Sequence, residues 1–388
     1  MRKILLFNLF LLFVLSACNQ SKKSKEGDSV SGSAQKIIQN LPENFYKRLE
    51  GEIAGKAVVM HLQKVGGDYS GSYYYNGSWL NLSTDTLIGK DSIVLFENSF
   101  TEYYFNEKAR QARLTLKWTG DGFKGDWESG DTKKKYAVSL QEQYPEGSYP
   151  FTAGMYEDSV KAFVGDPKSP AAKISFEYVQ NQNKDESAAW LDNQLKRISG
   201  IRRGTVDRSI GFKNIAEAYF ADYKQSAEEQ RKSSRDNEFR NWLNYTNNSQ
   251  QSIDYNDKGY VVIDFLADAY TGGAHGNYSS TMYCFDVKQK KQLGLSDVVK
   301  IDSNSLQTIL EKNFRKQYNV KASEPISKVL FDDFIKPNNN FYFNSNGLAF
   351  MYNPYEVASY AQGQIVVFIP FDDLKGYLNP AFATRMGL

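Results

Sequence analysis

Residues 260–287 read Tyr260-Val-Val-Ile-Asp-Phe-Leu-Ala-Asp-Ala-Tyr270, then Thr271-Gly-Gly-Ala-His-Gly-Asn277, then Tyr278-Ser-Ser-Thr-Met-Tyr-Cys-Phe-Asp-Val287. Two apolar, aromatic runs flank seven small or turn-forming residues that include three glycines. Runs of this composition predict β-strands, and the glycines predict a backbone bend that uses positive φ. We therefore expect two central strands joined by a tight loop, with the rest of the chain organised around them.

The first of these strands sorts its side chains into an apolar face and a face that carries two carboxylates among aromatic rings. The three glycines of the loop can bring backbone N–H groups together so that they hold an anion or a ligand carbonyl. His275 can add a donor or an acceptor. The ligand contacts expected in this stretch are Asp264, Asp268, Tyr270, Gly272, Gly273, His275 and Asn277.

His275 has three interpretations, taken in order: a structural turn residue, a contact to a partner or ligand, and a catalytic base. A histidine base needs a nucleophile or an orienting carboxylate, and Asp264 and Asp268 are the nearby candidates. A hydrolytic zinc site usually takes three protein ligands, but the chain has two histidines, His61 and His275, in different predicted domains. No phosphate-binding loop or dinucleotide motif is present. We predict no catalytic set, no metal and no cofactor.

The first 18 residues have the pattern of a targeting segment. Arg2 and Lys3 precede a short apolar core, and Leu15-Ser16-Ala17-Cys18 closes it. This pattern resembles the lipobox of bacterial lipoproteins, which implies a lipid on Cys18; the alternative is an ordinary signal peptide cut near Ala17. Residues 19–40, rich in Ser, Lys, Gly and Gln, predict a flexible tether. We expect a lipid-anchored protein of the cell envelope, at the periplasmic or the surface face of the outer membrane, with the lipid as its membrane attachment.

Charge and composition narrow the function classes. The formal net charge is +2, and removal of Arg2 and Lys3 brings it to 0 (2 − 2), so nucleic acid is not an expected partner. The 26 tyrosines and 25 phenylalanines favour β-structure and stacking surfaces. With Cys18 acylated, Cys284 is the remaining thiol, and its alternation with Met282 predicts a small buried hydrophobe.

Residues 41–145 predict an antiparallel β-meander, either a small barrel or a curved sheet, with a sandwich as the alternative. Short alternating runs recur every 10 to 14 residues, and apolar-x-Gly-x-apolar repeats centred on Gly51, Gly71 and Gly125 mark bends or close approaches. The many rings, among them Tyr74 and Trp79, either hold a ligand or form core. His61 is interpreted as a lone strand histidine without metal partners.

Four of the ten prolines fall between 145 and 170, which predicts a linker at 146–171. Beyond it, alternating strands and amphipathic helices predict a companion α+β subdomain at 172–250 and a second α+β domain at 251–388. Asn346-Gly347 predicts a hairpin, and Ile365 to Ile369 predicts a strand buried on both faces. The expected fold is multidomain: a β-domain, then α+β with helices on an antiparallel sheet.

Several motifs of the second half resemble a known family. They are Tyr270 to Asn277, Met282 to Val287, Leu293 to Val299, Phe341 to Tyr352, Asn353-Pro-Tyr-Glu-Val-Ala-Ser-Tyr-Ala-Gln-Gly363 and Ile365 to Phe371. Residues 172–378 thereby resemble the extracytoplasmic domain of RsiV-like, lysozyme-sensing anti-sigma factors, which also stands beside a small companion in PdaC-like peptidoglycan deacetylases. The resemblance adds Tyr355 and Glu356 to the expected ligand contacts.

The resemblance implies a binding module for a lysozyme-like protein or a peptidoglycan fragment. The chain departs from both relatives. The lipobox replaces the cytoplasmic segment and transmembrane helix of the anti-sigma factors, and the histidine pattern of the deacetylases' separate zinc-bearing catalytic domain is missing. Neither activity carries over. Two alternatives stay open: an enzyme acting on envelope glycans or peptides through Asp264, Asp268 and His275, and a structural envelope lipoprotein.

Overall fold

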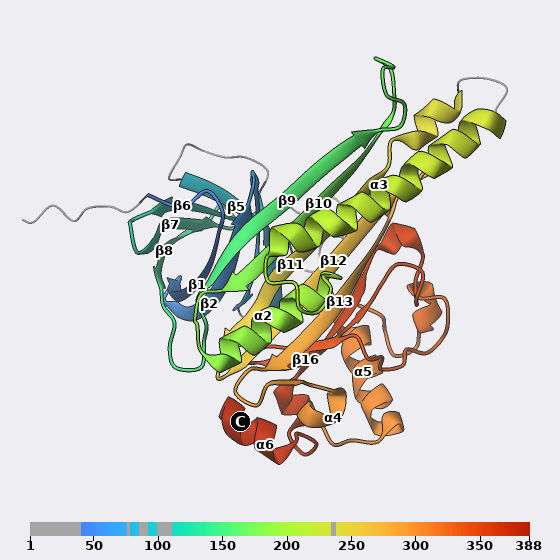
Figure 1. Ribbon diagram of the computed structural model, residues 1–388. Coiled ribbons are helices and arrows are strands. Elements are labelled where there is room, and N and C mark those ends of the chain that lie inside the picture. The colour runs from blue at the N-terminus through green and yellow to red at the C-terminus, as the bar shows by residue number, and fades with distance from the viewer. Residues whose placement is uncertain (1–39, 76–77, 85–91, 99–110, 234–237) are drawn as a thin grey trace, which may run out of the picture. The chain divides into compact units, whose positions relative to one another are not determined.

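The computed structural model describes residues 40–75, 78–84, 92–98, 111–233 and 238–388, which fall within one compact unit (Figure 1). The predicted signal peptide with Cys18, and nearly all of the predicted tether, lie outside the described residues. Among the helices that the structure describes, none combines the length and the apolar character needed to cross a bilayer.

The predicted pair of central strands lies within a six-stranded sheet. The two strands are antiparallel, with Tyr260 opposite Asp286 and Ala269 opposite Asn277. Every neighbouring pair in this sheet is antiparallel except β10 and β11, which are parallel. The order across the sheet is β14 (Lys291–Gln292), β13 (Asn277–Asp286), β12 (Tyr260–Tyr270), β11 (Thr246–Asp257), β10 (Ala171–Asn181) and β9 (Phe151–Lys161).

The predicted linker at 146–171 is wrong, because residues 151–161 form β9. This strand pairs with β10 from Phe151 opposite Asn181 to Lys161 opposite Ala171. The four prolines precede β9 or lie in its turn to β10, since a proline inside the strand could not donate to the ladder. The predicted boundary at 250/251 also falls inside a strand, β11, so one sheet spans both predicted α+β segments.

One face of the sheet is covered by the helices that connect the parallel strands, α2 (Glu186–Ile198) and α3 (Arg208–Ser233) (Figure 1). The Asp185 carboxylate caps α2 by accepting from the backbone N–H groups of Ser187 and Ala188. Leu191 and Leu195 of α2 share a buried cluster with Ile263 of β12. A 3₁₀ helix, η1 (Glu238–Leu243), leads into β11.

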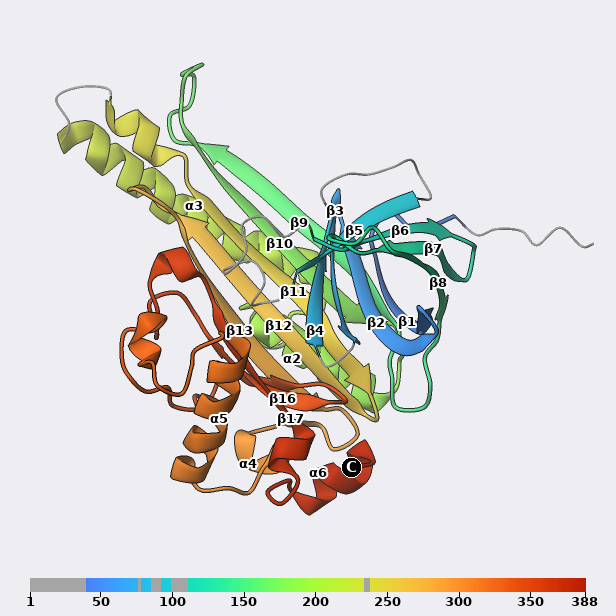
Figure 2. The same ribbon diagram turned by 180° about the vertical axis from the view of Figure 1, so that it is seen from behind.

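A smaller sheet covers the opposite face of the central sheet (Figure 2). Along β12 and β13, Val262 and Cys284 alternate with the residues that face α2, so their side chains belong to the buried cluster on this second face. The predicted hairpin is confirmed: Phe341 pairs with Phe350 and Phe343 with Leu348. This layer consists of β15 (Phe341–Phe343), β16 (Gly347–Tyr352), β17 (Ile365–Pro370), α4 (Leu295–Val298), α5 (Ser303–Gln317), α6 (Pro380–Met386), and the 3₁₀ helices η2 (Ile326–Lys328), η3 (Tyr360–Gln362) and η4 (Phe371–Leu374).

The N-terminal β-domain is a closed antiparallel barrel, as predicted, in which β1 also pairs with β8. An added Cβ at Gly51, Gly71 or Gly125 would lie 1.9–2.2 Å from a carbonyl oxygen of the neighbouring strand, so these positions need glycine for close approach. The strands are β1 (Phe45–Ile53), β2 (Lys56–Val65), β3 (Asp68–Tyr75), β4 (Ser78–Ser83), β5 (Ser92–Asn98), β6 (Arg113–Trp118), β7 (Gly122–Glu128) and β8 (Lys135–Glu142).

The barrel packs against the central sheet through buried polar contacts. Arg48 Nε donates to the Asn256 carbonyl at 2.9 Å, and Gln63 Nε2 donates to the Gln251 carbonyl at 2.8 Å. Tyr74 and Trp79, on the outer wall of the barrel, lie against aromatic rings of the small sheet. The barrel interior is filled by one apolar cluster that includes Tyr73. Of the predicted barrel rings, some are therefore core and others face the second half of the chain.

Candidate functional site

The predicted glycine loop joins β12 to β13 at one end of the central sheet. Gly272 and Gly273 have φ of +94° and +98°, the left-handed region that glycine adopts without a steric penalty, so the predicted bend is confirmed. The Tyr270 hydroxyl donates to the Gly273 carbonyl at 3.0 Å and closes the loop onto its own strand. Gly273, His275 and Asn277 are exposed, which leaves the loop open to a partner.

His275 lies on this loop with its ring stacked on Tyr360 of η3. The ring centroids are 4.3 Å apart and the planes differ by 27°. Nδ1 lies 2.7 Å from the Gly276 carbonyl oxygen, which can only accept, so Nδ1 carries a proton. Neutral His275 therefore presents Nε2 as an acceptor.

The two strand carboxylates do not join His275. Asp268 accepts a hydrogen bond from Asn248 Nδ2 at 2.9 Å. Asp264 lies four residues further from the loop, about 13 Å along a strand, and its register partner is Met282. The structure thus places the predicted Asp264, Asp268 and His275 set in separate environments.

The Asn353–Gly363 motif lies at the same end of the molecule as the glycine loop. Tyr360 contacts three other rings. Its ring centroid lies 5.9 Å from that of Tyr278 and 5.7 Å from that of Tyr355, and the His275 ring is stacked on it. Tyr355 is 53% exposed and has φ of +70°, an uncommon conformation for a bulky residue. We refer to His275, Tyr278, Tyr355 and Tyr360 as the ring cluster.

Asn353 fixes the Asn-Pro-Tyr-Glu segment to strand β13. Its Oδ1 accepts from the Ser280 backbone N–H at 2.8 Å, and its Nδ2 donates to the Ser280 carbonyl at 3.1 Å. Nδ2 also lies 3.4 Å from Oε1 of the exposed Glu356. These bonds fix the Asn-Pro-Tyr-Glu segment to β13. Tyr355 contacts Tyr360, and the His275 ring is stacked on Tyr360, so the segments that carry Tyr355 and His275 meet here.

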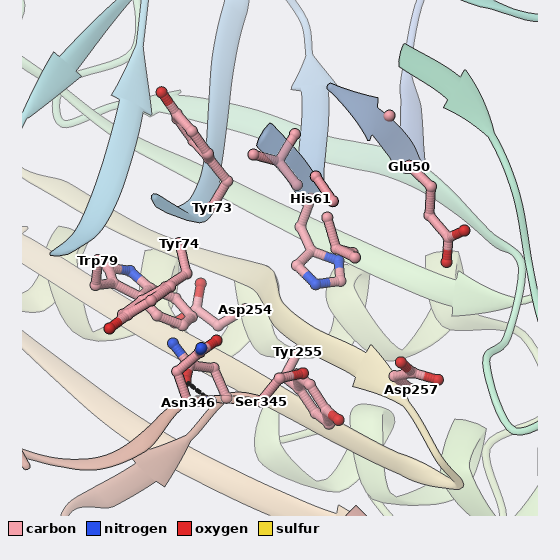
Figure 3. A pocket seen from close by; sticks show the side chains of 15 residues that line it. Glu50, His61, Tyr73, Tyr74, Trp79, Asp254, Tyr255, Asp257, Ser345 and Asn346 are labelled. Atoms are coloured by element: carbon pink, nitrogen blue, oxygen red, sulfur yellow. Dashed lines mark hydrogen bonds between the residues drawn. The ribbon is translucent and has the colours of Figure 1, made fainter. Parts of the chain in front are cut away.

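A second site that the sequence did not indicate lies between the barrel, the central sheet and the β15–β16 hairpin. It is a cleft of about 460 Å³ that adjoins a smaller space of about 190 Å³. His61, Trp79 and Asp254 line both spaces, and Figure 3 shows their side chains around the larger one. Asp264 lines the smaller space. A volume of several hundred Å³ is typical of small-molecule sites.

Asp254 and Asp264 form an acidic pair on the wall of this cleft. Asp254 is the additional residue of a bulge in β11, where the register shifts between Ile253 and Tyr255, and β12 places Asp264 beside it. Burial raises the pKa of Asp264 to about 6. Burial and the charge of Asp264 hold the pKa of Asp254 well above its usual range. The pair therefore retains protons at a pH at which ordinary aspartates are ionised.

His61 enters the cleft from β2 and is neutral. Burial, with the nearby charge of Arg48, lowers its pKa to about 3. The Tyr46 hydroxyl accepts from Asn256 Nδ2 at 3.2 Å and lies 2.8 Å from His61 Nδ1. Because that hydroxyl donates its own proton to Nδ1, His61 carries its proton on Nε2.

Among the described residues no group of three or more His, Cys, Asp or Glu side chains is placed to hold a metal ion. His61 lies on strand β2, as predicted, but its position on a cleft was missed, as were Asp254, Tyr278 and Tyr360, whereas Trp79 was among the rings predicted either to hold a ligand or to form core. A sequence signal existed for two of them, because Tyr278 follows the glycine loop and Tyr360 lies five residues after Tyr355.

Two family models match parts of the chain. Residues 131–278 match the model described as deacetylase PdaC, and residues 296–372 match the model described as a protein of unknown function, DUF3298. The chain therefore contains a PdaC-type and a DUF3298-type domain, which confirms the PdaC-like part of the resemblance. The likeness to lysozyme-sensing anti-sigma factors is not confirmed by these matches and stays a prediction. No curated protein matches the chain.

Two solved structures of DUF3298 proteins are similar to this chain. One, from Bacteroides fragilis, is 21% identical, with a TM-score of 0.56 over 62% of this chain and 99% of that one. Another, from Pseudomonas aeruginosa, is 16% identical, with a TM-score of 0.42 over 60% of this chain and 96% of that one. The first match shows a shared fold.

Proposed function

We propose that this protein is a lipid-anchored binding protein of the cell envelope, and that the ring cluster is the surface that binds its partner. The partner class is an extracytoplasmic protein of the lysozyme type, with a cell-wall glycan as the alternative. The observation that carries the proposal is the group of four rings gathered from two segments of the chain at one end of the sheet, with His275 and Tyr355 exposed.

Rings of this kind suit a protein interface. Tyrosine supplies a large contact area with few rotatable bonds, and it is enriched among residues that dominate binding energy. Tyr355 and His275 expose their rings, while Asn353 fixes the loop backbone beneath them. A surface held in advance loses less conformational entropy when a partner binds.

The backbone of Tyr355 supports the same conclusion. A φ of +70° costs free energy for a residue with a bulky side chain, and such strain is found at functional sites more often than elsewhere. The Tyr355 N–H donates to the Ala358 carbonyl at 3.0 Å. This hydrogen bond closes the turn and fixes the backbone from which the Tyr355 ring projects.

The enzymatic alternative loses support from the geometry. His275 has its contacts with Gly276 and Tyr360, whereas Asp264 lies on the wall of the cleft and Asp268 bonds with Asn248. A histidine base oriented by either carboxylate needs hydrogen-bond reach between the two groups. We therefore assign no catalytic role to these three residues.

The test is calorimetric titration of the purified protein with a c-type lysozyme and, separately, with soluble peptidoglycan fragments. We expect binding that Tyr360→Ala or Tyr355→Ala weakens by at least about tenfold. Tyr136→Ala is the matched control, because Tyr136 is 41% exposed on the barrel, far from the ring cluster in the sequence. If neither probe binds, or if the control weakens binding equally, the proposal fails.

Lipid anchoring is tested separately in cells. A Cys18→Ser variant is expected to lose incorporation of a labelled fatty acid and to leave the membrane fraction, whereas the unchanged protein keeps both. Retention of the label by the variant would contradict the anchor.

A further inference from the structure

The cleft between the barrel and the central sheet is separate from the ring cluster and has no part in the function proposed above. Its wall contains buried polar side chains whose hydrogen-bonding capacity the described protein does not satisfy. Gln63 is 3% exposed and Asn344 is 4% exposed, yet Gln63 Oε1, Asn344 Nδ2 and Asp264 Oδ1 have no protein partner. Buried polar groups in native proteins are nearly always hydrogen-bonded, so these three atoms call for an occupant of the cleft.

We infer that this cleft binds a hydroxyl-rich small molecule, a short saccharide, through Gln63, Asp264 and Asn344 beside the rings of Tyr74 and Trp79. Hydroxyl groups both donate and accept, so one saccharide can satisfy acceptors and donors on the same wall. The protein offers both kinds of atom.

In each of these side chains, the second polar atom of the amide or carboxyl group is hydrogen-bonded to the protein, and this bond fixes the orientation of the group. Gln63 Nε2 donates to the Gln251 carbonyl at 2.8 Å, which leaves Oε1 as the open acceptor. Asn344 Oδ1 accepts from the backbone N–H groups of Asn346 at 2.7 Å and Gly347 at 3.0 Å, which leaves Nδ2 as the open donor. Asp264 Oδ2 accepts from Ser280 Oγ at 3.3 Å, which leaves Oδ1.

The apolar part of the wall fits the same ligand class. Tyr74 and Trp79 are cross-strand partners on the outer face of the barrel and both line the cleft. Rings beside amides and carboxyl groups suit the alternation of C–H faces and hydroxyl edges on a sugar. The volume of about 460 Å³ leaves room for such a molecule.

The charges of the cleft disfavour the other ligand classes. Neither lysine nor arginine is among the described lining residues, so an anion would find no positive charge there. A cation would face the donor groups of Asn344 and His61, and the acidic pair holds protons that reduce its negative charge. Glu50 and Asp257, also on the wall, are ion-paired with Arg48.

The experiment is ligand-observed NMR and calorimetric titration of the purified protein with defined trisaccharides of glucose, mannose, galactose and N-acetylglucosamine. We expect one of them to bind, and Asp264→Asn and Asn344→Asp each to weaken it by about tenfold or more, since each change reverses one hydrogen-bond role at constant size. Asp268→Asn is the matched control, because Asp268 lies on the same strand, outside the lining of the cleft, and should leave affinity unchanged.

Two further readings complete the test. Circular dichroism and thermal melts establish that each variant is folded before its affinity is compared. Ring-cluster variants such as Tyr360→Ala should retain saccharide binding, so failure at one site is distinguishable from failure at the other. The inference is overturned if no trisaccharide binds at about 10 mM, if Asp264→Asn and Asn344→Asp bind as the unchanged protein does, or if calcium or a simple amine binds instead.

Discussion

Asp254, the additional residue in the bulge of β11, lies beside Asp264 of β12, so that two half-buried carboxyl groups share one wall of the cleft. Burial raises the pKa of both, and the charge of Asp264 raises that of Asp254 further. Like charges this close resist simultaneous ionisation. The wild-type protein therefore holds a pair of acids that folding makes harder to ionise, and this has a measurable consequence for stability.

Asp264→Asn should stabilise the folded protein above the pKa of this carboxyl and have no such effect below pH 4. The folded pKa of about 6 exceeds the unfolded value of about 4, so the folded state binds more protons between these values and its stability falls as pH rises through them. The amide removes that loss and can still bond with Ser280. We expect Tm at pH 8 to rise by roughly 2–4 °C.

Thermal melts at pH 4, 6 and 8 check this prediction, with Asp268→Asn as the control on the same strand. A gain of equal size at pH 4 and pH 8 would show that the carboxyl proton is not the cause.

His61 predicts the opposite pH dependence. Its folded pKa of about 3 lies below the unfolded value of about 6.5, so the unfolded state takes up a proton first and stability is lost as pH falls from 6.5 towards 3. In His61→Asn, the amide oxygen can still accept from the Tyr46 hydroxyl, and the titrating ring is gone. The loss of unfolding free energy between pH 7.5 and pH 5 should shrink by roughly 2 kcal/mol.

Urea unfolding at the two pH values measures this difference. His275→Ala serves as the control, because His275 is exposed and is not among the residues that line the cleft. An unchanged acid sensitivity in His61→Asn would mean that other groups dominate the acid transition.

The features of the fold that were predictable from the sequence are those with a local pattern. Alternation around three glycines predicted β12, β13 and their loop, and glycines such as Gly51 marked the strands of the barrel. Strand β9 was missed for a physical reason. It is an edge strand whose central residues are half-buried or exposed, so it lacks the apolar alternation that marks a strand, and the prolines at its ends resemble a linker.

The ring cluster and the cleft also differ in how much of each was predictable from local sequence patterns. Residues of the ring cluster lie in two short motifs: the composition of the glycine loop brought His275 into the predicted contact set, and the family resemblance added Tyr355. The cleft joins Gln63, Asp254 and Asn344, which are separated by 191 and 90 positions (254 − 63 and 344 − 254). The bulge in β11 and the packing of the barrel, the central sheet and the β15–β16 hairpin bring these residues together. Neither feature produces a local pattern that a single sequence shows.

Arg48 is predicted to be the most sensitive contact between the barrel and the sheet. Its side chain is 1% exposed and pairs with Glu50 and with Asp257, 3.3 Å away on the sheet, while Nε donates to the Asn256 carbonyl. Arg48→Ala leaves two carboxylates without their cation in a partly buried setting, which should lower the free energy of unfolding by about 3–5 kcal/mol.

Urea titration followed by tryptophan fluorescence measures this loss. Arg113→Ala is the matched control, because its side chain is 48% exposed and its pair with Glu128 faces solvent. Similar losses in the two variants would contradict a special role for the buried arginine.

Cys284 provides a reporter for the layer that covers the cleft. It is 2% exposed within the cluster shared by β13 and the small sheet, its thiol lies 3.5 Å from the Phe341 carbonyl oxygen, and burial raises its pKa. A buried, protonated thiol reacts slowly.

In a Cys18→Ser background, Cys284 should resist a disulfide reagent in the native protein and react completely in urea. Because labelling then requires opening of the fold, a saccharide bound in the cleft should slow it by the factor 1 + [L]/Kd. Rapid native labelling, or a rate that a bound ligand leaves unchanged, would show that this layer opens independently of the cleft.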